Sequence, residues 1–419
     1  MPFMMNNNYL KILGVLFFWI STIKAQTNSL TGSPYSLFGL GVQTNSNIGR
    51  NSALGKGGIA LESNYLLNTL NPASFTGIPE KSFLLDIGFL GELNNVSTND
   101  KDENRFSSNF SNLAMGFSIN ERSGMGISIV PFTDVGYALI GIATNIEGSQ
   151  DQFISNIIGS GGLNDLSLHY GYRIYDNLSL GMKASFLFGV IDQTENIIFE
   201  ETFLNIAEEN YYNGFRLGFG LQYKIDDQYT LGFTTDFPTS LSGSQDRSVF
   251  KSLDFIPTEV EDENDLAIDS FELPLELGFG ASARFFNSLT VNLDYKGNLW
   301  GFTKQSDDIG DYVDQSIISL GAQYRAKEIG LKYWENIEFR AGFNYDSGYL
   351  KVNDQTINNY SVTAGIGFPI SIRGGSMINI SYATGQRGTV SGILVEEKFN
   401  MINVNISLKD IWFRKLKFN

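Results

Sequence analysis

Charged side chains recur in this sequence at alternate positions of runs that are otherwise apolar. The residues that could bind a ligand or one another are His169, Arg173, Arg216, Glu276, Arg284, Arg325, Glu338 and Arg340. An arginine can hold a ligand carboxylate through two parallel hydrogen bonds, which makes Arg216, Arg325 and Arg340 candidate anchors. The same side chains could instead form a network of ion pairs and hydrogen bonds around an internal segment. No single arginine is distinguished by its sequence surroundings, and this favours the network.

Catalysis would need a different set of residues. His169 is the only histidine, and the chain has no cysteine. Hydrolytic sites combine a histidine with acidic and nucleophilic partners, but the residues around His169 show only the alternation of a strand. We interpret His169 as a structural residue, and we predict neither an enzyme nor a bound cofactor.

Two acidic runs invite a metal hypothesis. The first holds Glu259, Glu261, Asp262, Glu263, Asp265 and Asp269, and the second holds Asp307, Asp308, Asp311 and Asp314. Calcium binds several carboxylate oxygens, and such ions could bridge an outer surface to lipopolysaccharide. The spacing matches no calcium-binding loop, and runs of charge are usually solvated, so we predict no metal site.

The composition favours an all-β protein that does not bind nucleic acid. Its 419 residues include 44 glycines, 33 phenylalanines and 19 tyrosines but only 9 prolines. The net charge of −16 argues against phosphate binding, which needs a basic patch. The lack of cysteine excludes disulfides and lipid attachment through cysteine.

Residues 1–25 are predicted to be a signal peptide. Lys11 precedes an apolar run from Ile12 to Ile20, and Ala25 completes a cleavage-site pattern before Gln26. The apolar run is shorter than the roughly 20 residues that a membrane-spanning helix needs. The chain is therefore expected to be exported.

From Lys81 onward, apolar and polar residues alternate with a period of two, which predicts strands with one apolar face. The pattern covers residues 165–175, 178–190, 215–224, 229–237, 273–285, 289–296, 318–325, 337–346, 362–368, 378–383 and 402–409. A soluble sandwich or solenoid is the alternative. However, the polar faces carry mostly Ser, Gly, Asn and Thr, and segments of about 9–11 residues suit tilted membrane crossings. We predict a transmembrane antiparallel β-barrel of about 14 strands over residues 81–409.

Short and long connections alternate along this region. Turns are predicted at 175–177, 225–227 and 286–287, and long loops at 192–213, 238–270, 297–314 and 385–398. Outer-membrane barrels have short periplasmic turns and longer outer loops. In this orientation residues 410–419 form a periplasmic tail, with Trp412 and Phe413 at the periplasmic interface of the outer membrane.

The alternation fails once, within residues 124–145. Only one crossing fits there, yet two strand-like pieces are separated by Pro131, Phe132, Thr133 and Asp134. Proline lacks an amide donor and marks sheet edges or bulges. We predict a single long third strand with a kink at Pro131; the alternative is an ordinary hairpin that starts at this proline.

Residues 49–77 have no clean period and are rich in glycine, asparagine and small side chains, which permit close packing. The run that contains Gly55, Gly57 and Gly58, followed by Asn71-Pro72-Ala73, resembles the N-terminal hatch of the FadL-type outer-membrane transporters. The resemblance implies that residues 26–80 form a hatch in the lumen of a fourteen-stranded barrel. It also implies that Asn71, Pro72 and Ala73 join the hatch to the wall.

Residues 33–41 and the ending at 412–415 resemble the Bacteroidetes branch of these proteins, which includes PorV-type subunits of protein secretion machinery. The resemblance implies transport of a hydrophobic small molecule, such as a fatty acid, through a Gram-negative outer membrane, whose lipid and lipopolysaccharide would surround the barrel. The kink from Pro131 to Asp134 would then be a lateral exit.

The alternative is a non-transporting barrel that binds other proteins of an outer-membrane secretion or assembly complex. The two functions assign different roles to an apolar set in the outer loops. In a transporter this set would line a capture groove, and in a complex it would be covered by another chain. Its residues are Phe153, Ile154, Ile157, Ile158, Phe199, Phe203 and Leu204.

Overall fold

The computed structural model describes residues 31–44, 48–99, 101–145, 151–200, 202–253, 256–303, 305–307, 310–327, 330–370, 375–392 and 394–411. The predicted signal peptide lies outside these ranges, as do Trp412 and Phe413 of the predicted tail. Within them, no helix has the length and apolar character needed to cross a membrane.

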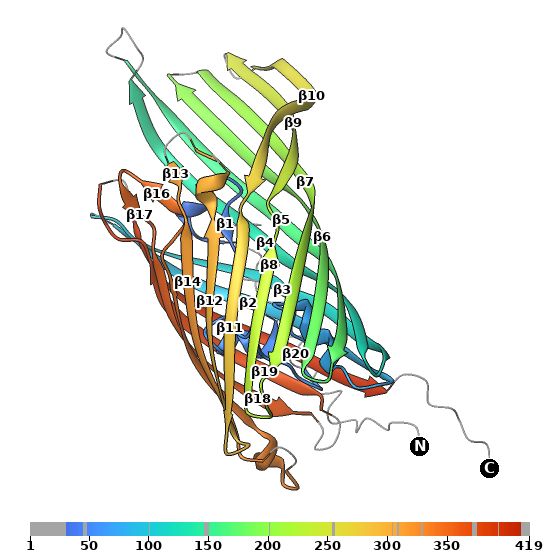
Figure 1. Cartoon of the computed structure of the whole chain (residues 1–419). Helices are drawn as coiled ribbons and strands as arrows, with labels where there is room; N and C mark the ends of the chain where they lie inside the picture. The colour runs from blue at the N-terminus through green and yellow to red at the C-terminus, as the bar shows by residue number, and fades with distance from the viewer. Residues whose placement is uncertain are drawn as a thin grey trace, which may run out of the picture.

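The described residues form a closed barrel of fourteen antiparallel strands, as predicted (Figure 1). The barrel closes because β2 pairs with β20 from Ser82 opposite Ile411 to Ser97 opposite Glu396. Two of the fourteen crossings consist of two strands each. In chain order the crossings are β2 (Ser82–Ser97), β3 (Asp102–Asn120), β4 (Ser123–Asn145), β5 (Gln152–Tyr175), β6 (Leu178–Phe199), β7 (Thr202–Lys224), β8 (Tyr229–Asp236) with β9 (Thr239–Leu253), β10 (Ile256–Leu273) with β11 (Leu275–Phe285), β12 (Leu289–Leu299), β14 (Gln315–Arg325), β15 (Glu338–Asp346), β18 (Asn359–Pro369), β19 (Met377–Arg387) and β20 (Glu396–Ile411).

The sequence alternation sets which side chains face outward. On β5, Ser167 and His169 are buried inside the barrel. The residues that alternate with them, Leu168 and Tyr170, are 44% and 41% exposed on its outer surface. An exposed apolar band of this kind suits contact with lipid rather than water. The inward faces are polar and largely buried, so much of the lumen is occupied.

Two prolines explain the divided crossings. β7 pairs with β8 along Gly218–Lys224 and with β9 along Phe203–Asn213, and Pro238 separates β8 from β9. Pro274 separates β10 from β11 in the neighbouring crossing. Proline cannot donate a ladder hydrogen bond, so the sheet is interrupted at the same height in both crossings.

The predicted long loops at 192–213 and 238–270 are wrong. Strands β6 and β7 continue through the first region, and β9 and β10 occupy most of the second. The strands from β3 to β7 are 19 to 24 residues long, well beyond the predicted crossing length. Figure 1 shows β4, β5, β6, β7, β9 and β10 rising above the rest of the barrel as one curved sheet, which we call the raised sheet.

The two ends of the barrel differ. At the turn end, tight connections follow Asn120, Tyr175, Lys224 and Phe285. The opposite, loop end carries η4 (Trp300–Phe302) and a small sheet of β13 (Gly310–Tyr312), β16 (Leu350–Val352) and β17 (Gln355–Thr356). A further 3-10 helix, η5 (Tyr333–Asn336), lies in the β14–β15 connection at the turn end.

The third crossing is the single strand predicted from the sequence. β4 runs from Ser123 to Asn145 and has a register shift between Pro131 and Thr133 against β5, where Phe132 is the extra residue. A second shift lies between Leu139 and Ile142. The bulge at Pro131 is the kink that the sequence predicted.

The N-terminal part of the described chain lies within the barrel. It contains η1 (Pro34–Leu37), β1 (Val42–Gln43), η2 (Gly49–Ala53) and η3 (Pro72–Gly77). We call residues 48–78 the inner segment. Its apolar side chains Ile48, Leu67, Phe75 and Ile78 pack against Leu84, Ala114 and Val130 of the wall.

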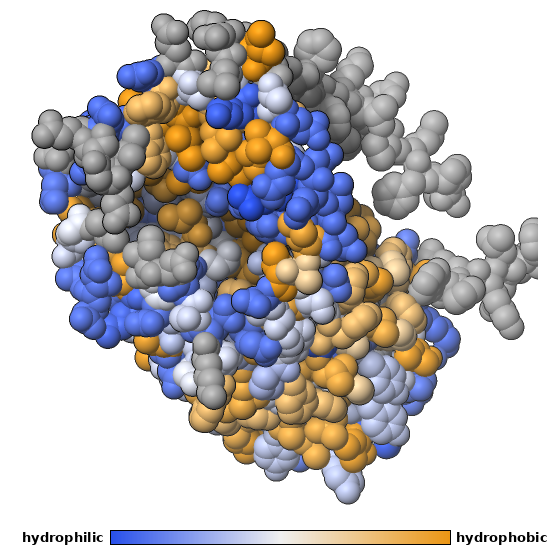
Figure 2. All heavy atoms as spheres, turned by 90° about the horizontal axis from the view of Figure 1, so that it is seen from above, coloured by the Kyte–Doolittle hydropathy of each residue, from blue (hydrophilic) through white to orange (hydrophobic). Residues whose placement is uncertain are grey.

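An apolar cluster crosses the lumen nearer the loop end. Leu40 from the N-terminal part packs with Phe271 and Trp300. The ring of Tyr349 stacks on the same indole at 5.4 Å between centroids, and the ring of Tyr312 lies tilted against it at 4.9 Å. Viewed from the loop end, Figure 2 shows a hollow with hydrophobic side chains deep inside it and a mostly hydrophilic rim. The barrel is therefore filled at two levels, by the inner segment and by this cluster.

Candidate functional site

The wall of the barrel opens between β3 and β4. Their ladder runs from Asn120 opposite Ser123 to Leu113 opposite Ile129, and no pairing between them continues beyond Ile129 in the described residues. Above this point β3 pairs only with β2, and β4 pairs with β5 on its other side. We call this break the gap. The last pair, at Ile129, lies two residues before Pro131, so the bulge of β4 adjoins the loss of pairing.

The short strand β1 occupies the free edge of β4 at the gap. Val42 pairs with Asp134 and Gln43 with Thr133. The Thr44 amide donates to the Phe132 carbonyl at 3.0 Å, and the Thr44 hydroxyl donates to the Pro131 carbonyl. Gly41 makes this approach possible, because a Cβ there would lie 2.6 Å from the Asp134 carbonyl oxygen and its φ is +98°.

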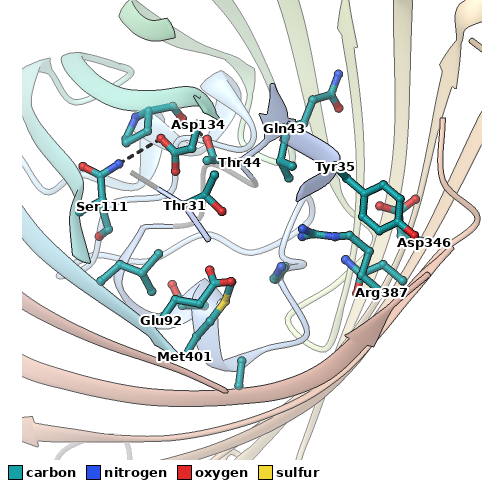
Figure 3. Close-up of a pocket in the computed structure, with 18 of the residues that line it drawn as sticks. Thr31, Tyr35, Gln43, Thr44, Glu92, Ser111, Asp134, Asp346, Arg387 and Met401 are labelled. Carbon is teal, nitrogen blue, oxygen red and sulfur yellow. Dashed lines mark hydrogen bonds between the residues drawn. The ribbon is translucent and has the colours of Figure 1, made fainter. Parts of the chain in front are cut away.

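A cavity of about 170 Å³ lies directly behind the gap. We call it the gap cavity. Side chains from β2, β3, β4, β19, β20 and the N-terminal part of the chain line it, and Figure 3 shows several of them directed into it. Across its mouth, the Asn109 side chain of β3 donates to the Asp134 carboxylate of β4 at 3.0 Å. This hydrogen bond bridges the two strands that the backbone leaves unpaired.

The four residues predicted at the lateral gate lie at this place. Pro131 and Asp134 line the gap cavity, and Asp134 is 6% exposed. The Thr133 hydroxyl accepts the Leu163 amide at 3.2 Å across the bulge. Phe132 packs against the apolar cluster nearer the loop end. All four residues therefore lie at or beside the gap, and their role as a lateral exit stays a prediction.

The predicted hatch residues contact the inward faces of strands. The Gly55 amide donates to the Thr363 hydroxyl at 2.9 Å, and its φ is +63°. The amides of Gly58 and Ile59 donate to the Asp294 carboxylate. Gly57 also lies against Asp294, where a Cβ would clash. Glycine at these positions therefore allows close approach to the wall.

Asn71 attaches the inner segment to the opposite side of the barrel. Its side-chain amide donates to the carbonyls of Ile59 and Leu221, each at 3.0 Å, and its oxygen accepts the Ala73 amide at 3.0 Å. Pro72 then begins η3. Wall glycines make room for this turn, because a Cβ at Gly220 would meet Asn71 and one at Gly181 would meet Ala73.

Arg216 holds the two interrupted crossings together. It donates to the Phe237 carbonyl at 3.0 Å and to the Pro274 carbonyl at 2.6 Å, which flank the two breaks in the wall. It also pairs with Glu276 at 2.8 Å, and Lys296 contacts the same carboxylate. These contacts with the wall favour a structural role for Arg216, and its role as a ligand anchor stays a prediction.

Other predicted lumen residues bind the inner segment. Glu338 is fully buried, accepts the Tyr65 hydroxyl at 2.5 Å and contacts both Arg340 and Arg325. Arg173 donates to the Thr76 carbonyl at 2.8 Å and lies 3.6 Å from Glu62. Arg284 differs, since its side chain is exposed near the turn end. Except for Arg284, these residues make the contacts expected of a polar network around an internal segment.

His169 is buried against the inner segment. Its Nε2 lies 2.9 Å from the Ser128 hydroxyl, and its ring stacks on Phe75 at 4.9 Å between centroids. Within the described part of the chain no carboxylate contacts the ring. This arrangement has the packing of a structural residue and lacks the acidic partner that a hydrolytic histidine uses.

The residues predicted for an apolar groove are divided between two faces of the raised sheet. Ile154 and Phe203 are 45% and 41% exposed and share one face, because both align with Ile198. Ile158 lies on this face too. Ile157, Phe153, Phe199 and Leu204 alternate with these three residues and lie on the opposite, concave face of the raised sheet. On that face Ile157 packs against the apolar cluster. A single groove with all seven residues is therefore wrong, because strands replace the expected loop.

The first acidic run lies on β10, along the edge of the raised sheet. Arg247 of β9 contacts Glu261 at 3.6 Å and Glu208 of β7 at 3.4 Å. Among the residues that the structure describes, no three acidic or histidine side chains are grouped as a metal site.

Sequence reasoning missed much of the gap cavity lining. Residues Thr31, Tyr35, Gln43 and Thr44 reach it from the N-terminal part, and Arg387 reaches it from β19. Glu92 and Lys56 also line it. The available signal was weak: a charge on an inward strand face shows that the side chain enters the lumen but not which cavity it reaches.

Several solved structures share the fold. The toluene transporter TbuX of Ralstonia pickettii is 16% identical with a TM-score of 0.60, over 88% of this chain and 99% of that chain. A monoaromatic hydrocarbon channel, CymD, is 18% identical with a TM-score of 0.58, over 89% and 100% of the two chains. A FadL homologue of Pseudomonas aeruginosa is 13% identical with a TM-score of 0.59, over 88% and 98%. These proteins are described as channels or transporters or as a FadL homologue, and none as an enzyme.

No curated protein matches this chain. A family model described as BamG matches residues 5–419. The match extends from the predicted signal peptide through the inner segment and all fourteen crossings, so it includes every feature of the candidate site. Because that model covers nearly the whole sequence, the protein belongs to the BamG family.

Proposed function

We propose that the protein transports a hydrophobic small molecule through the outer membrane and releases it sideways through the gap. The observation that carries this proposal is the position of the gap cavity, directly behind a break in the β3–β4 ladder. An apolar molecule that leaves through the wall enters lipid. It avoids exposing apolar surface to water, which costs about 25 cal/mol per Å².

The similarity of the fold to known channels supports the proposal. The barrel resembles structures titled as a toluene transporter and a monoaromatic hydrocarbon channel. The inner segment would act as the hatch and the loop end would face outward. The apolar residues on the concave side of the raised sheet, Ile157 and Leu204 among them, would form the first contact with the molecule.

A disulfide across the gap tests lateral release. The chain has no native cysteine, so Asn109→Cys with Asp134→Cys places one defined pair where the side chains now hydrogen-bond. In cells with a lipopolysaccharide outer leaflet, uptake of radiolabelled toluene should be normal when the pair is reduced and fall to the level of cells without the protein when it is oxidised.

The control is a second pair within the closed part of the same ladder. Ala114 and Ser128 are directly opposed on β3 and β4, and cysteines there should leave uptake unchanged in either redox state. Equal uptake by the oxidised and reduced forms of the Asn109–Asp134 pair would exclude lateral release.

The family match favours a second function, that of a barrel within an outer-membrane secretion or assembly complex. The name BamG relates the family to assembly, and the raised sheet offers an exposed surface outside the closed barrel. Gentle purification from native membranes, followed by mass spectrometry of proteins and lipids, separates the two functions. A stoichiometric protein partner without a bound small molecule would replace transport as the preferred function.

A further inference from the structure

Glu92 extends from β2 into the gap cavity. Glu92 is only 8% exposed. Figure 3 shows its carboxylate directed toward the middle of the cavity, between Thr31 and Met401. It makes no hydrogen bond or ion pair with any residue that the structure describes. A carboxylate taken out of water without a partner is unfavourable, so this position indicates a ligand that supplies the partner.

A second carboxylate lies on the opposite side of the cavity, at the gap. Asp134 is 6% exposed, and its Oδ1 accepts the hydrogen bond from Asn109. The Asn109 amide is a neutral donor, so it supplies no positive charge beside this carboxyl group. A molecule that entered through the gap would therefore pass Asp134 before it reached Glu92.

The cations of the cavity do not balance these acids. Arg387 lies 3.1 Å from Glu397, a carboxylate outside the cavity lining, so the charge of this arginine is already matched. Lys56 remains as the other cation of the lining. It shares the lining with three acids, Glu92, Asp134 and Asp346. Among the residues that the structure describes, Asp346 accepts hydrogen bonds from the neutral Gln315 side chain and the Gly348 amide, each at 2.8 Å.

The same cavity also has apolar side chains in its lining. They include Leu90 of β2, Phe110 of β3 and Pro131 of β4, and the last two belong to the strands that flank the gap. A ligand that satisfies both regions has an apolar body at the gap and a positive head between Glu92 and Asp134. A ligand carboxylate in that place would be repelled by both acids.

We propose that the gap cavity selects an amphiphile with an ammonium head and an apolar body. The inference rests on the proposed function, because it specifies the class of hydrophobic molecule that uses the gap. The ammonium donates charge-assisted hydrogen bonds to Glu92 and Asp134. The apolar body lies along Leu90 and Phe110 and points toward the membrane.

Three probes that share one ring test the head group: phenethylamine, phenylacetate and ethylbenzene. Their affinities are measured by titration of the full chain in nanodiscs of zwitterionic lipid, with empty nanodiscs as the blank. Phenethylamine is expected to bind at least tenfold more tightly than phenylacetate. Glu92→Gln should weaken phenethylamine about 10- to 100-fold, the effect of losing one charged hydrogen bond, and leave ethylbenzene unchanged.

Glu121→Gln is the matched control, since Glu121 is exposed in a turn far from the cavity, and all three affinities should stay the same. If Glu92→Gln also loses ethylbenzene, the cavity has changed shape, and Asp134→Asn becomes the deciding variant with the same expected loss for the amine. Tighter binding of phenylacetate, or unchanged amine affinity in the deciding variant, overturns the inference. Uptake of toluene by the disulfide pair is independent of these affinities, so transport can stand when amine selection fails.

Discussion

At the scale of single residues, most charged side chains of the lumen are occupied by structural contacts. Arg216 is the strongest case, because one guanidinium binds two backbone carbonyls at the proline breaks and a buried carboxylate. Glu338 has the same character on the other side, where Tyr65 of the inner segment binds it. The alternation predicted that these residues face the lumen. It could not predict their partners, which lie as far as 273 residues away along the chain.

Arg216→Met should destabilise the barrel, because the carbonyls of Phe237 and Pro274 lose their donor and Glu276 keeps only Lys296. Removing one partner of a buried ion pair costs about 3–5 kcal/mol. The loss of stability is measured as a lower unfolding temperature of the barrel on heat-modifiability gels. Arg284→Met is the control, since Arg284 is exposed, and its unfolding temperature should match the wild type. A stable Arg216→Met barrel with weakened ligand binding would instead identify Arg216 as an anchor.

Tyr35 provides a prediction about pH. Burial raises the pKa of its phenol from 10.0 to about 12, and its hydroxyl donates to the Val395 carbonyl at 2.6 Å. The folded state thus favours the neutral phenol. This contribution to stability is fully present below pH 10.0 and is lost as the pH rises through about 12.

The measurement compares the wild type with Tyr35→Phe in an ultraviolet titration. The difference between the two curves should show one phenol that ionises near pH 12. The stability advantage of the wild type over the variant should also shrink between pH 10.0 and 12. Ionisation of this phenol near its ordinary value would show that η1 is not held in the barrel.

At the scale of elements, the bulge of β4 accounts for the gap. Phe132 is the extra residue between the pairs Pro131–Asn164 and Thr133–Leu163, and the β3–β4 ladder ends two residues earlier at Ile129. The bulge re-aims the strand, and β1 takes up part of the freed edge. The single proline was enough to predict the kink. The insertion of β1 carried no sequence signal, because two residues show no period.

Deleting Phe132 together with Pro131→Thr should restore regular pairing of β4 with β5 and bring β4 back toward β3. Toluene uptake should then fall to the level of cells without the protein, while heat-modifiability shows that the barrel still assembles. Deletion of Ile140 is the control, because it removes the other bulge of the same strand, between Leu139 and Ile142. Normal uptake by the Phe132 variant would mean that the molecule leaves by another path.

The raised sheet marks where sequence reasoning failed at this scale. Residues such as Asn196, Asn205 and Asp262 have low strand propensity, and polar stretches between alternating segments are typical of loops. In the structure Asn196 and Asn205 are paired and hydrogen-bond through their side chains at 2.8 Å. Long-range pairing with neighbouring strands overrides the local preference. The barrel crossings were predictable because lipid on one side and the lumen on the other impose the same alternation on each strand.

At the scale of the whole molecule, the barrel is asymmetric about its axis. The raised sheet continues beyond the loop end on one side, and the small sheet of β13, β16 and β17 lies on the other, as Figure 1 shows. The fill of the lumen is asymmetric along the axis as well, with the inner segment toward the turn end and the apolar cluster nearer the loop end. The two proposed functions, transport and complex formation, would therefore use different surfaces. The first needs the gap and its cavity, and the second needs the raised sheet.

Cysteine labelling in intact cells distinguishes these surfaces and fixes the orientation. Phe203 is 41% exposed on the outward face of the raised sheet, and Asn99 is exposed in the β2–β3 connection at the same end. As transport is the preferred function, Phe203→Cys and Asn99→Cys should react with an impermeant maleimide at similar rates. Glu121→Cys, at the turn end, should react only after the cells are broken, because that end faces the periplasm. If Phe203→Cys is protected in cells but reacts after purification while Asn99→Cys reacts in both, a partner covers the raised sheet, and the role in a complex replaces transport. Labelling of Glu121→Cys in intact cells would reverse the orientation, and the capture surface would then lie on the wrong side of the membrane for uptake.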